Sequence, residues 1–209
     1  MKLKIAYYSG WLITRLLSRF LFGIKVIGRE NIPRIGGFIM ASNHVSYYDP
    51  PLVGSWSTRQ MAFLAKKELF SNWLFSFVLH RVNALPVSRG GVDRAALRQS
   101  VQTIQSGLGL VFFPEGTRSR SDQFLEPRAG MGMVASKAGC PVIPTYLHGP
   151  NKLKDCFLRR ERMAVIYGEP LTGEWISSCG ADKEGYSKIV STIMDRIGTL
   201  KRMYLDQLG

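Results

Sequence analysis

A histidine and an aspartate, His44 and Asp49, stand five residues apart in the segment 43–51. An imidazole has a reference pKa of about 6.5, so His44 can act as a general base near neutral pH. A carboxylate on one ring nitrogen fixes the tautomer, leaves the other nitrogen as an acceptor and stabilises the imidazolium that forms. Asp before Pro50 is typical of a helix start, so we expect Asp49 at the N-cap and facing His44. A plain cap beside an unrelated histidine would give the same pattern.

A second polar group follows the apolar run that ends at Phe113, in the order Glu115, Gly116, Thr117, Arg118. Glycine lets the backbone approach a ligand closely, and the planar guanidinium of Arg118 suits a phosphate. Thr117 offers a hydroxyl, and we expect Glu115 to hold Arg118 by an ion pair. Taken singly, these residues are also typical of a turn and a surface ion pair.

Short apolar runs alternate with helical stretches and supply the elements that must position both groups. We expect strands at 37–41, 61–65, 82–87, 108–113, 142–147 and 163–167, and helices at 92–106 and 184–204. This alternation predicts a single α/β domain with a mostly parallel central sheet flanked by helices. Ligands bind at the carboxyl ends of strands in such sheets, so His44 and Arg118 should meet at one edge.

Residues 69–79 stand apart because their apolar side chains cover almost the whole helical circumference, from Phe70 to Leu79. A helix of this kind is either buried or in contact with lipid. The sequence leaves open whether the segment is a core helix, a wall for an acyl chain or a second membrane contact.

Length and composition exclude several classes of protein. A chain of 209 residues suits one domain, and 45% hydrophobic with 21% charged residues excludes disorder. The net charge of +13 indicates an anionic partner, namely nucleic acid, an anionic membrane or a phosphorylated substrate. Nucleic acid is disfavoured because the densest basic cluster, at 159–162, is short and contains Glu161.

The charge is concentrated towards the N-terminus, where the only acid among residues 1–48 is Glu30. On a helical wheel, one sector of the first 22 residues is polar and includes Lys4, Arg15 and Arg19, while most of the rest is apolar. The two arginines disfavour a transmembrane span and a cleaved signal peptide. We expect residues 1–25 to form an amphipathic helix on the membrane interface, with its cations near lipid phosphates. A helix packed on the protein's own core is the alternative.

The cysteines and the other histidines carry no comparable pattern. Cys140, Cys156 and Cys179 show no metal-ligand spacing, which disfavours a disulfide framework or a zinc site and favours a reducing compartment. His80 and His148 have no carboxylate at matching spacing, so we expect them to be structural. The chain contains no G-x-S-x-G motif, so nothing indicates an acyl-serine intermediate.

The motifs together resemble a known family. Asn43-His44-x4-Asp49 with FPEGTRS at 113–119 is similar to the glycerolipid acyltransferases, specifically the 1-acyl-sn-glycerol-3-phosphate (lysophosphatidic acid) acyltransferases. The block at 65–69, leading to Val87-Ser88-Arg89, resembles the family's second motif, and residues 139–144 resemble its fourth. The resemblance covers about residues 37–147 in the family's order.

The resemblance implies a reaction and roles for these residues. His44, oriented by Asp49, would deprotonate the sn-2 hydroxyl of lysophosphatidic acid, which then attacks the thioester of acyl-CoA or acyl-carrier protein. Arg118 and Lys66 would bind the acceptor phosphate in a pocket shaped by Glu115, Gly116 and Thr117, with Asn43 and Ser46 in support. No metal or cofactor is expected. The product, phosphatidic acid, would belong to phospholipid biosynthesis. The protein would be peripheral or monotopic at the cytoplasmic face of the cell membrane, and residues 26–209 would form the acyltransferase domain.

Within the family, glycerol 3-phosphate or another lysophospholipid is an alternative acceptor. A basic nucleic-acid-binding protein is the remote alternative from a different class.

Overall fold

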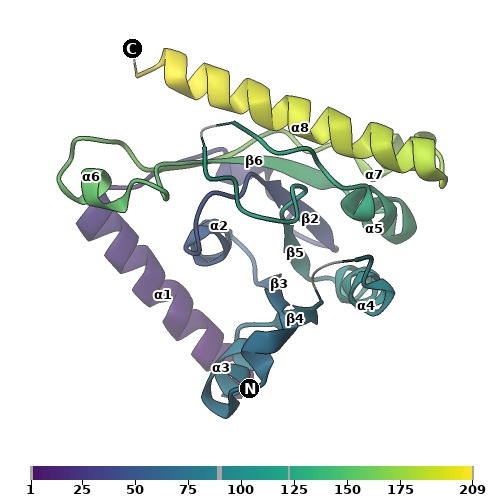
Figure 1. Cartoon of the computed structure of the whole chain (residues 1–209), viewed down its shortest axis with the longest axis horizontal. Helices are drawn as coiled ribbons and strands as arrows, with labels where there is room; N and C mark the ends of the chain where they lie inside the picture. Colours follow the sequence, from purple (N-terminus) through teal and green to yellow (C-terminus); the bar gives the residue numbers. More distant parts are fainter. Residues whose placement is uncertain (1, 89–90, 122, 209) are drawn as a thin grey trace.

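A seven-stranded sheet forms the centre of the computed structural model, which describes residues 2–88, 91–121 and 123–208 (Figure 1). Arg89, part of the second family-like block, lies outside the described residues. The strands are β1 (Lys25–Ile27), β2 (Phe38–Ser42), β3 (Met61–Lys66), β4 (Ala84–Val87), β5 (Gly109–Phe112), β6 (Val142–His148) and β7 (Ala164–Tyr167). They lie in the order β1-β7-β6-β2-β5-β3-β4, and every neighbouring pair is parallel except β6 and β7. The predicted fold class, a mostly parallel α/β sheet flanked by helices, is therefore confirmed.

The six predicted strands are present, with small shifts at their ends. The largest shift is at β4, because Val82 ends the preceding helix and Asn83 adopts a left-handed conformation (φ 59°) before the strand starts. The edge strand β1 was not predicted. It is only three residues long and begins with an exposed lysine, so its sequence carries neither an apolar run nor a clear alternation.

Helices cover both faces of the sheet (Figure 1). One face packs against α4 (Arg94–Gln105), α5 (Gly130–Ala138), α7 (Gly173–Ser178) and α8 (Lys183–Asp206). The other packs against α2 (Asp49–Trp56) and α6 (Leu153–Phe157). The helix α1 (Lys2–Phe22) lies against α2 on that second side, and α3 (Trp73–Arg81) follows the 3₁₀ turns of Lys67–Phe70. A further 3₁₀ segment spans Arg29–Asn31.

The carboxyl ends of three adjacent parallel strands define the edge that carries the site. Strand β5 lies between β2 and β3, with Ala41 opposite Phe112 and Phe63 opposite Val111. The chain leaves β2 into the loop with His44, leaves β5 into the turn with Glu115, and ends β3 at Lys66. The predicted common edge is therefore present.

Arg15, on the polar side of α1, faces the protein. The Arg15 guanidinium lies over the Trp11 ring at 3.3 Å, and its Nε and Nη2 donate to the carbonyls of Ser55 (2.6 Å) and Ser57 (3.0 Å). The hydroxyl oxygen of Tyr7 accepts a hydrogen bond from the backbone amide of Met61 at 2.9 Å. Burial lowers the pKa of Arg15 to about 10. The expectation that Arg15 lies near lipid phosphates is thus wrong, because this cation attaches α1 to α2.

The apolar side of α1 is left facing outward. Its exposed residues are Ile5, Leu12, Ile13, Leu16, Leu17, Phe20 and Leu21, with Phe20 72% exposed. No helix among the described residues combines the length and the hydropathy needed to cross a bilayer.

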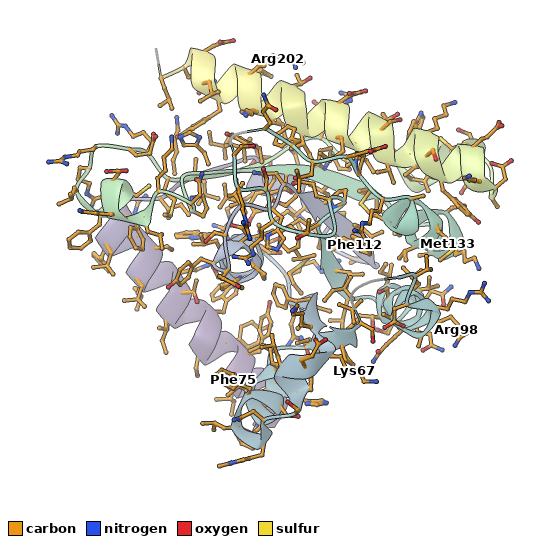
Figure 2. All side chains as sticks on the ribbon, viewed as in Figure 1. Lys67, Phe75, Arg98, Phe112, Met133 and Arg202 are labelled. Atoms are coloured by element: carbon orange, nitrogen blue, oxygen red, sulfur yellow. The ribbon has the colours of Figure 1, made fainter. Side chains whose placement is uncertain are left out.

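Helix α3 has no buried residue, so its interpretation as a core helix is wrong. Trp73 is 79% exposed and Phe75 59%, and Leu74, Phe77 and Val78 are also exposed. The helix contacts α1 near the start of the chain (Figure 1). Figure 2 labels Phe75 beside this corner of the molecule. The two helices therefore present exposed apolar side chains next to each other.

Candidate active site

The side chains of His44 and Asp49 meet in the loop between β2 and α2. His44 Nδ1 lies 2.7 Å from Asp49 Oδ2, with Asp49 fully buried and His44 8% exposed. The same carboxylate oxygen accepts the amides of Val45 (2.6 Å) and Ser46 (2.8 Å). No described residue hydrogen-bonds the other ring nitrogen, Nε2. The carboxylate therefore holds Nδ1, and Nε2 is the nitrogen that can accept a proton.

Asp49 reaches this position by a different route from the one expected. Helix α2 begins at Asp49 itself, with Tyr48 at the N-cap and no side-chain cap hydrogen bond. The prediction of Asp49 as N-cap is wrong, because its carboxylate points back to the loop amides instead of forward to the helix. The four-residue loop thus folds around one carboxylate oxygen.

Both polar motifs are joined through His44. Its backbone amide donates to Glu115 Oε1 at 2.8 Å, and its carbonyl accepts the amide of Ser119 at 2.8 Å. The imidazole stacks on Phe113 with ring centroids 4.1 Å apart. The two hydrogen bonds, to Glu115 and Ser119, fix the backbone of His44, and the stacking on Phe113 fixes the plane of its ring.

Asn43 and Ser46 support the loop from within. The Asn43 amide donates to the carbonyl of Leu147 at 3.0 Å and accepts its amide at 2.8 Å, which fastens the loop to β6. Ser46 Oγ accepts the amide of Tyr48 at 3.3 Å. Neither side chain contacts the imidazole, so their support acts through the backbone.

Glu115 is a positioning residue for the two loops and does not pair with Arg118. Its Oε1 accepts from His44, and its Oε2 accepts the amide of Leu125 at 2.8 Å. Burial raises the pKa of this carboxyl, while the two amide hydrogen bonds act in the opposite direction. The expected Glu115–Arg118 ion pair is wrong, since both carboxylate oxygens already bind backbone amides.

Arg118 instead lies over the ring of Tyr47, with the guanidinium carbon 3.5 Å from the ring centroid. Tyr47 belongs to the His44 loop and is exposed, so this contact holds the cation beside that loop. Gly116 and Thr117 are exposed on the same turn, and Gly116 has φ +68°. Lys66 is exposed at the end of β3, with no ion pair to another described residue.

One cation of this region was missed by the sequence reasoning. Arg128 donates its backbone amide to the carbonyl of Pro114 at 2.9 Å, so the chain returns to the turn after β5. No spacing rule connects residue 128 with residue 116, and only the hydrogen-bonded loop brings them together.

The remaining histidines and cysteines lie outside the site. His148 Nε2 lies 3.1 Å from Glu161 Oε1, a carboxylate thirteen residues further along the chain and so not at the spacing of the His44–Asp49 pair. Burial alone would raise the pKa of Glu161, but its bonds to the Arg162 amide, His148 and Lys152 lower it to about 2. His80 contacts Ser76 on α3. All three cysteines are free, and burial raises the pKa of Cys140 to about 12, which keeps its thiol protonated.

Comparisons with known proteins agree with this arrangement. A family model described as Acyltransferase matches residues 23–148. The chain is 31% identical over 188 residues to the 1-acyl-sn-glycerol-3-phosphate acyltransferase of Bacillus subtilis (strain 168), covering 89% of this chain and 92% of that protein. It is 27% identical over 192 residues to the enzyme of the same name from Borreliella burgdorferi, covering 88% of this chain and 76% of that protein.

A solved structure shares the fold. The crystal structure of the 1-acyl-sn-glycerophosphate (LPA) acyltransferase PlsC from Thermotoga maritima superposes with a TM-score of 0.74, covering 97% of this chain and 81% of that one. The sequence identity is 24%, so this likeness is one of fold.

Proposed function

The chain belongs to the acyltransferase family, and on that premise we propose that it transfers a fatty acyl group to the sn-2 hydroxyl of 1-acyl-sn-glycerol 3-phosphate, giving phosphatidic acid. The observation that carries the proposal is the buried His44–Asp49 pair, 2.7 Å apart and joined through Glu115 to the turn that holds Arg118. The names of the similar proteins support the choice of acceptor. Glycerol 3-phosphate and other lysophospholipids are the alternative acceptors.

The proposed mechanism is direct transfer by general-base catalysis. His44 Nε2 takes the proton of the acceptor hydroxyl as its oxygen attacks the thioester carbonyl of the donor. The tetrahedral intermediate collapses with cleavage of the carbon–sulfur bond, and the imidazolium returns its proton to the leaving thiolate. Asp49 stabilises the imidazolium between these two transfers. Free acyl-CoA and acyl-carrier protein both supply such a thioester, and no cofactor is required.

The acceptor phosphate is proposed to bind at the carboxyl edge of the sheet. Arg118 offers a planar pair of donors, and Lys66 a second cation from the end of β3. Gly116 and Thr117 form the exposed turn between them. Glu115 holds this turn in place by accepting hydrogen bonds from the backbone amides of His44 and Leu125, and does not bind the phosphate itself.

A thioester-release assay tests this function. The purified chain should release free thiol when 1-acyl-sn-glycerol 3-phosphate is supplied, and release should be at least about tenfold slower with glycerol 3-phosphate or a lysophospholipid whose phosphate is a diester. Running acyl-CoA and acyl-carrier protein side by side identifies the donor. A higher kcat/KM for another acceptor would contradict the proposed substrate without contradicting acyl transfer.

The membrane surface is the second part of the proposal. Helix α1 (Lys2–Phe22) is proposed to lie in the interface at the cytoplasmic face of the cell membrane, as a peripheral or monotopic anchor. The predicted anchor, residues 1–25, was too long, because Ile24 is buried in the core and Lys25 begins β1. The outward apolar side of α1 supports this, and α3 adds a second contact because its exposed residues adjoin α1. No acid occurs between residues 1 and 29, or between residues 69 and 92. An apolar surface that carries only cations suits an anionic bilayer.

Serine substitutions on these helices should weaken binding to vesicles. Replacing Leu12 and Leu16 on α1, or Trp73 and Phe75 on α3, removes side chains that are each about half or more exposed. Transfer of one such side chain from water contributes about 1.5–3 kcal/mol when complete, so each pair should lower partitioning by about 10–100-fold. Flotation with vesicles of phosphatidylglycerol and phosphatidylcholine measures the effect.

A matched control lies on the opposite face of the molecule. Met203 and Leu205 are exposed on α8, so their double serine variant should float like the unmodified chain. Turnover of a short-chain, monomeric acceptor should stay the same in all three variants. If the α3 variant floated normally, α3 would not be a membrane contact. A chain that forms dimers only while α3 is intact would assign this surface to a second copy.

A further inference from the structure

A second guanidinium lies against the turn that holds Arg118. A Cβ atom built on Gly116 would lie 3.1 Å from Arg128 Cδ, 3.2 Å from Nε and 3.7 Å from Cζ. The Arg128 side chain therefore passes directly over the glycine. The left-handed backbone (φ +68°) favours glycine here, and a methyl group at this position would also press on the Arg128 side chain.

The position of Arg128 is set by the backbone. Its amide bonds the carbonyl of Pro114 at 2.9 Å, and the amide of Leu125 bonds Glu115 Oε2 at 2.8 Å. Glu115 in turn binds the amide of His44 through its other oxygen. A single buried carboxylate thus connects the segment that carries Arg128 with the segment that carries the candidate base.

Among the described residues, no carboxylate neutralises the two arginines at this turn. Arg128 is exposed, and no carboxylate of the described residues lies within ion-pair distance of it or of Arg118. The only acid of the turn, Glu115, is 2% exposed and directed towards backbone amides. Two guanidiniums beside one turn, with no described carboxylate paired to either, form a site for an anion that carries more than one negative charge.

We propose that Arg128 is a second ligand of the acceptor phosphate, opposite Arg118 across Gly116, and that it selects a phosphate monoester. This inference rests on the proposed function. A phosphate monoester carries about −1.5 to −2 charges at pH 7 and three terminal oxygens, enough for two guanidinium forks. A diester has one negative charge and two such oxygens, so it gains less from the second arginine. Together, Arg118 and Arg128 therefore distinguish a headgroup with a phosphate monoester from one with a phosphate diester.

Substitution of Arg128 tests this role. Arg128→Ala should raise the KM for 1-acyl-sn-glycerol 3-phosphate about 10–100-fold, with kcat within about threefold and an unchanged KM for the acyl donor. Arg128→Lys should recover part of the loss, because it restores the charge without the fork. With a monoacylglycerol, which lacks the phosphate, the slow residual rate should not change on substitution.

Two further variants make the result specific. Gly116→Ala should reproduce the KM effect, because the new methyl group displaces the Arg128 side chain. Arg120→Ala is the control, since Arg120 is an exposed arginine of the same loop without a hydrogen bond or ion pair to a described residue. Circular dichroism and thermal unfolding establish that each variant is folded.

The outcomes separate this inference from the proposed function. If Arg118→Ala raises the acceptor KM but Arg128→Ala does not, the phosphate site contains one arginine and the inference is wrong. The inference also fails if Arg128→Ala slows monoacylglycerol and its phosphate monoester equally. If the unmodified chain does not use the phosphate monoester at all, the proposed function fails first.

Discussion

Replacing His44 by alanine should lower kcat for acyl transfer by about 10²–10⁴-fold, the usual contribution of a general base. The acceptor hydroxyl is a poor nucleophile while it keeps its proton. The other histidine at this edge, His148 at the end of β6, has both ring nitrogens bonded, to the Tyr146 hydroxyl and to Glu161. The KM values for both substrates should change little, because the imidazole acts on the reacting oxygen and not on the phosphate. Thiol release at saturating substrate measures the effect.

Two companion variants separate loss of the base from loss of the fold. His44→Asn keeps a donor that can reach Asp49 but has no basic nitrogen, so it should be as inactive as the alanine variant. His80→Ala, assayed with a monomeric acceptor, should have normal turnover, because His80 bonds only within α3 and contacts Phe70. Turnover of folded His44→Asn near that of the unmodified chain would disprove the assignment.

Asp49→Asn should give an effect of similar size, a fall in kcat of up to about 10⁴-fold, by comparison with the same change in a serine-protease triad. Asp49 Oδ2 accepts three hydrogen bonds, from His44 Nδ1 and the amides of Val45 and Ser46. An amide group of the same shape can accept them through its oxygen, but it has no charge to stabilise the imidazolium. Measured kcat and KM should show the loss almost entirely in kcat.

Stability measurements distinguish positioning from folding in this variant. Asp49→Ala leaves the Val45 and Ser46 amides without their acceptor, at a cost of about 1–3 kcal/mol for each buried group. Asp49→Asn should unfold closer to the unmodified chain, which thermal denaturation can show. Asp182→Asn is the control, because Asp182 caps α8 through the Gly185 amide, away from the site. An active Asp49→Asn enzyme would mean that the carboxylate only holds the loop.

Sequence reasoning recovered the elements that rest on local signals. The predicted strands consist mainly of apolar residues, and the two amphipathic helices have regular polar faces, so their types and approximate ends were predictable. Strand β1 was not, because a three-residue edge strand is specified by its pairing with β7. The contacts of Arg15 were also beyond reach, since a helical wheel does not show that this cation bonds the carbonyls of Ser55 and Ser57.

In the site, too, residues marked by local sequence patterns could be predicted, and contacts made only by the folded chain could not. His44, Asp49 and Arg118 could be found because their spacing and the strands before them are visible in the sequence. The partners of Glu115 could not, because they are the backbone amides of His44 and Leu125, and an amide has no sequence signature. Arg128 was missed for a related reason, since only the return of the loop to Pro114 brings it to Gly116.

The attachment of α1 to α2 through Arg15 has a geometric consequence for access to substrate. Arg15 bonds the carbonyls of Ser55 and Ser57 at one end of α2, and Asp49 is the first residue at the other end. With a rise of about 1.5 Å per residue, these eight residues set a rigid offset of about 12 Å between the anchor and the base. Once α1 lies at a given depth in a leaflet, the height of Nε2 above the hydrocarbon is therefore fixed. On the proposed membrane placement, an acceptor would present its hydroxyl while its acyl chain stays among neighbouring lipids, and lateral diffusion in two dimensions would replace extraction into water.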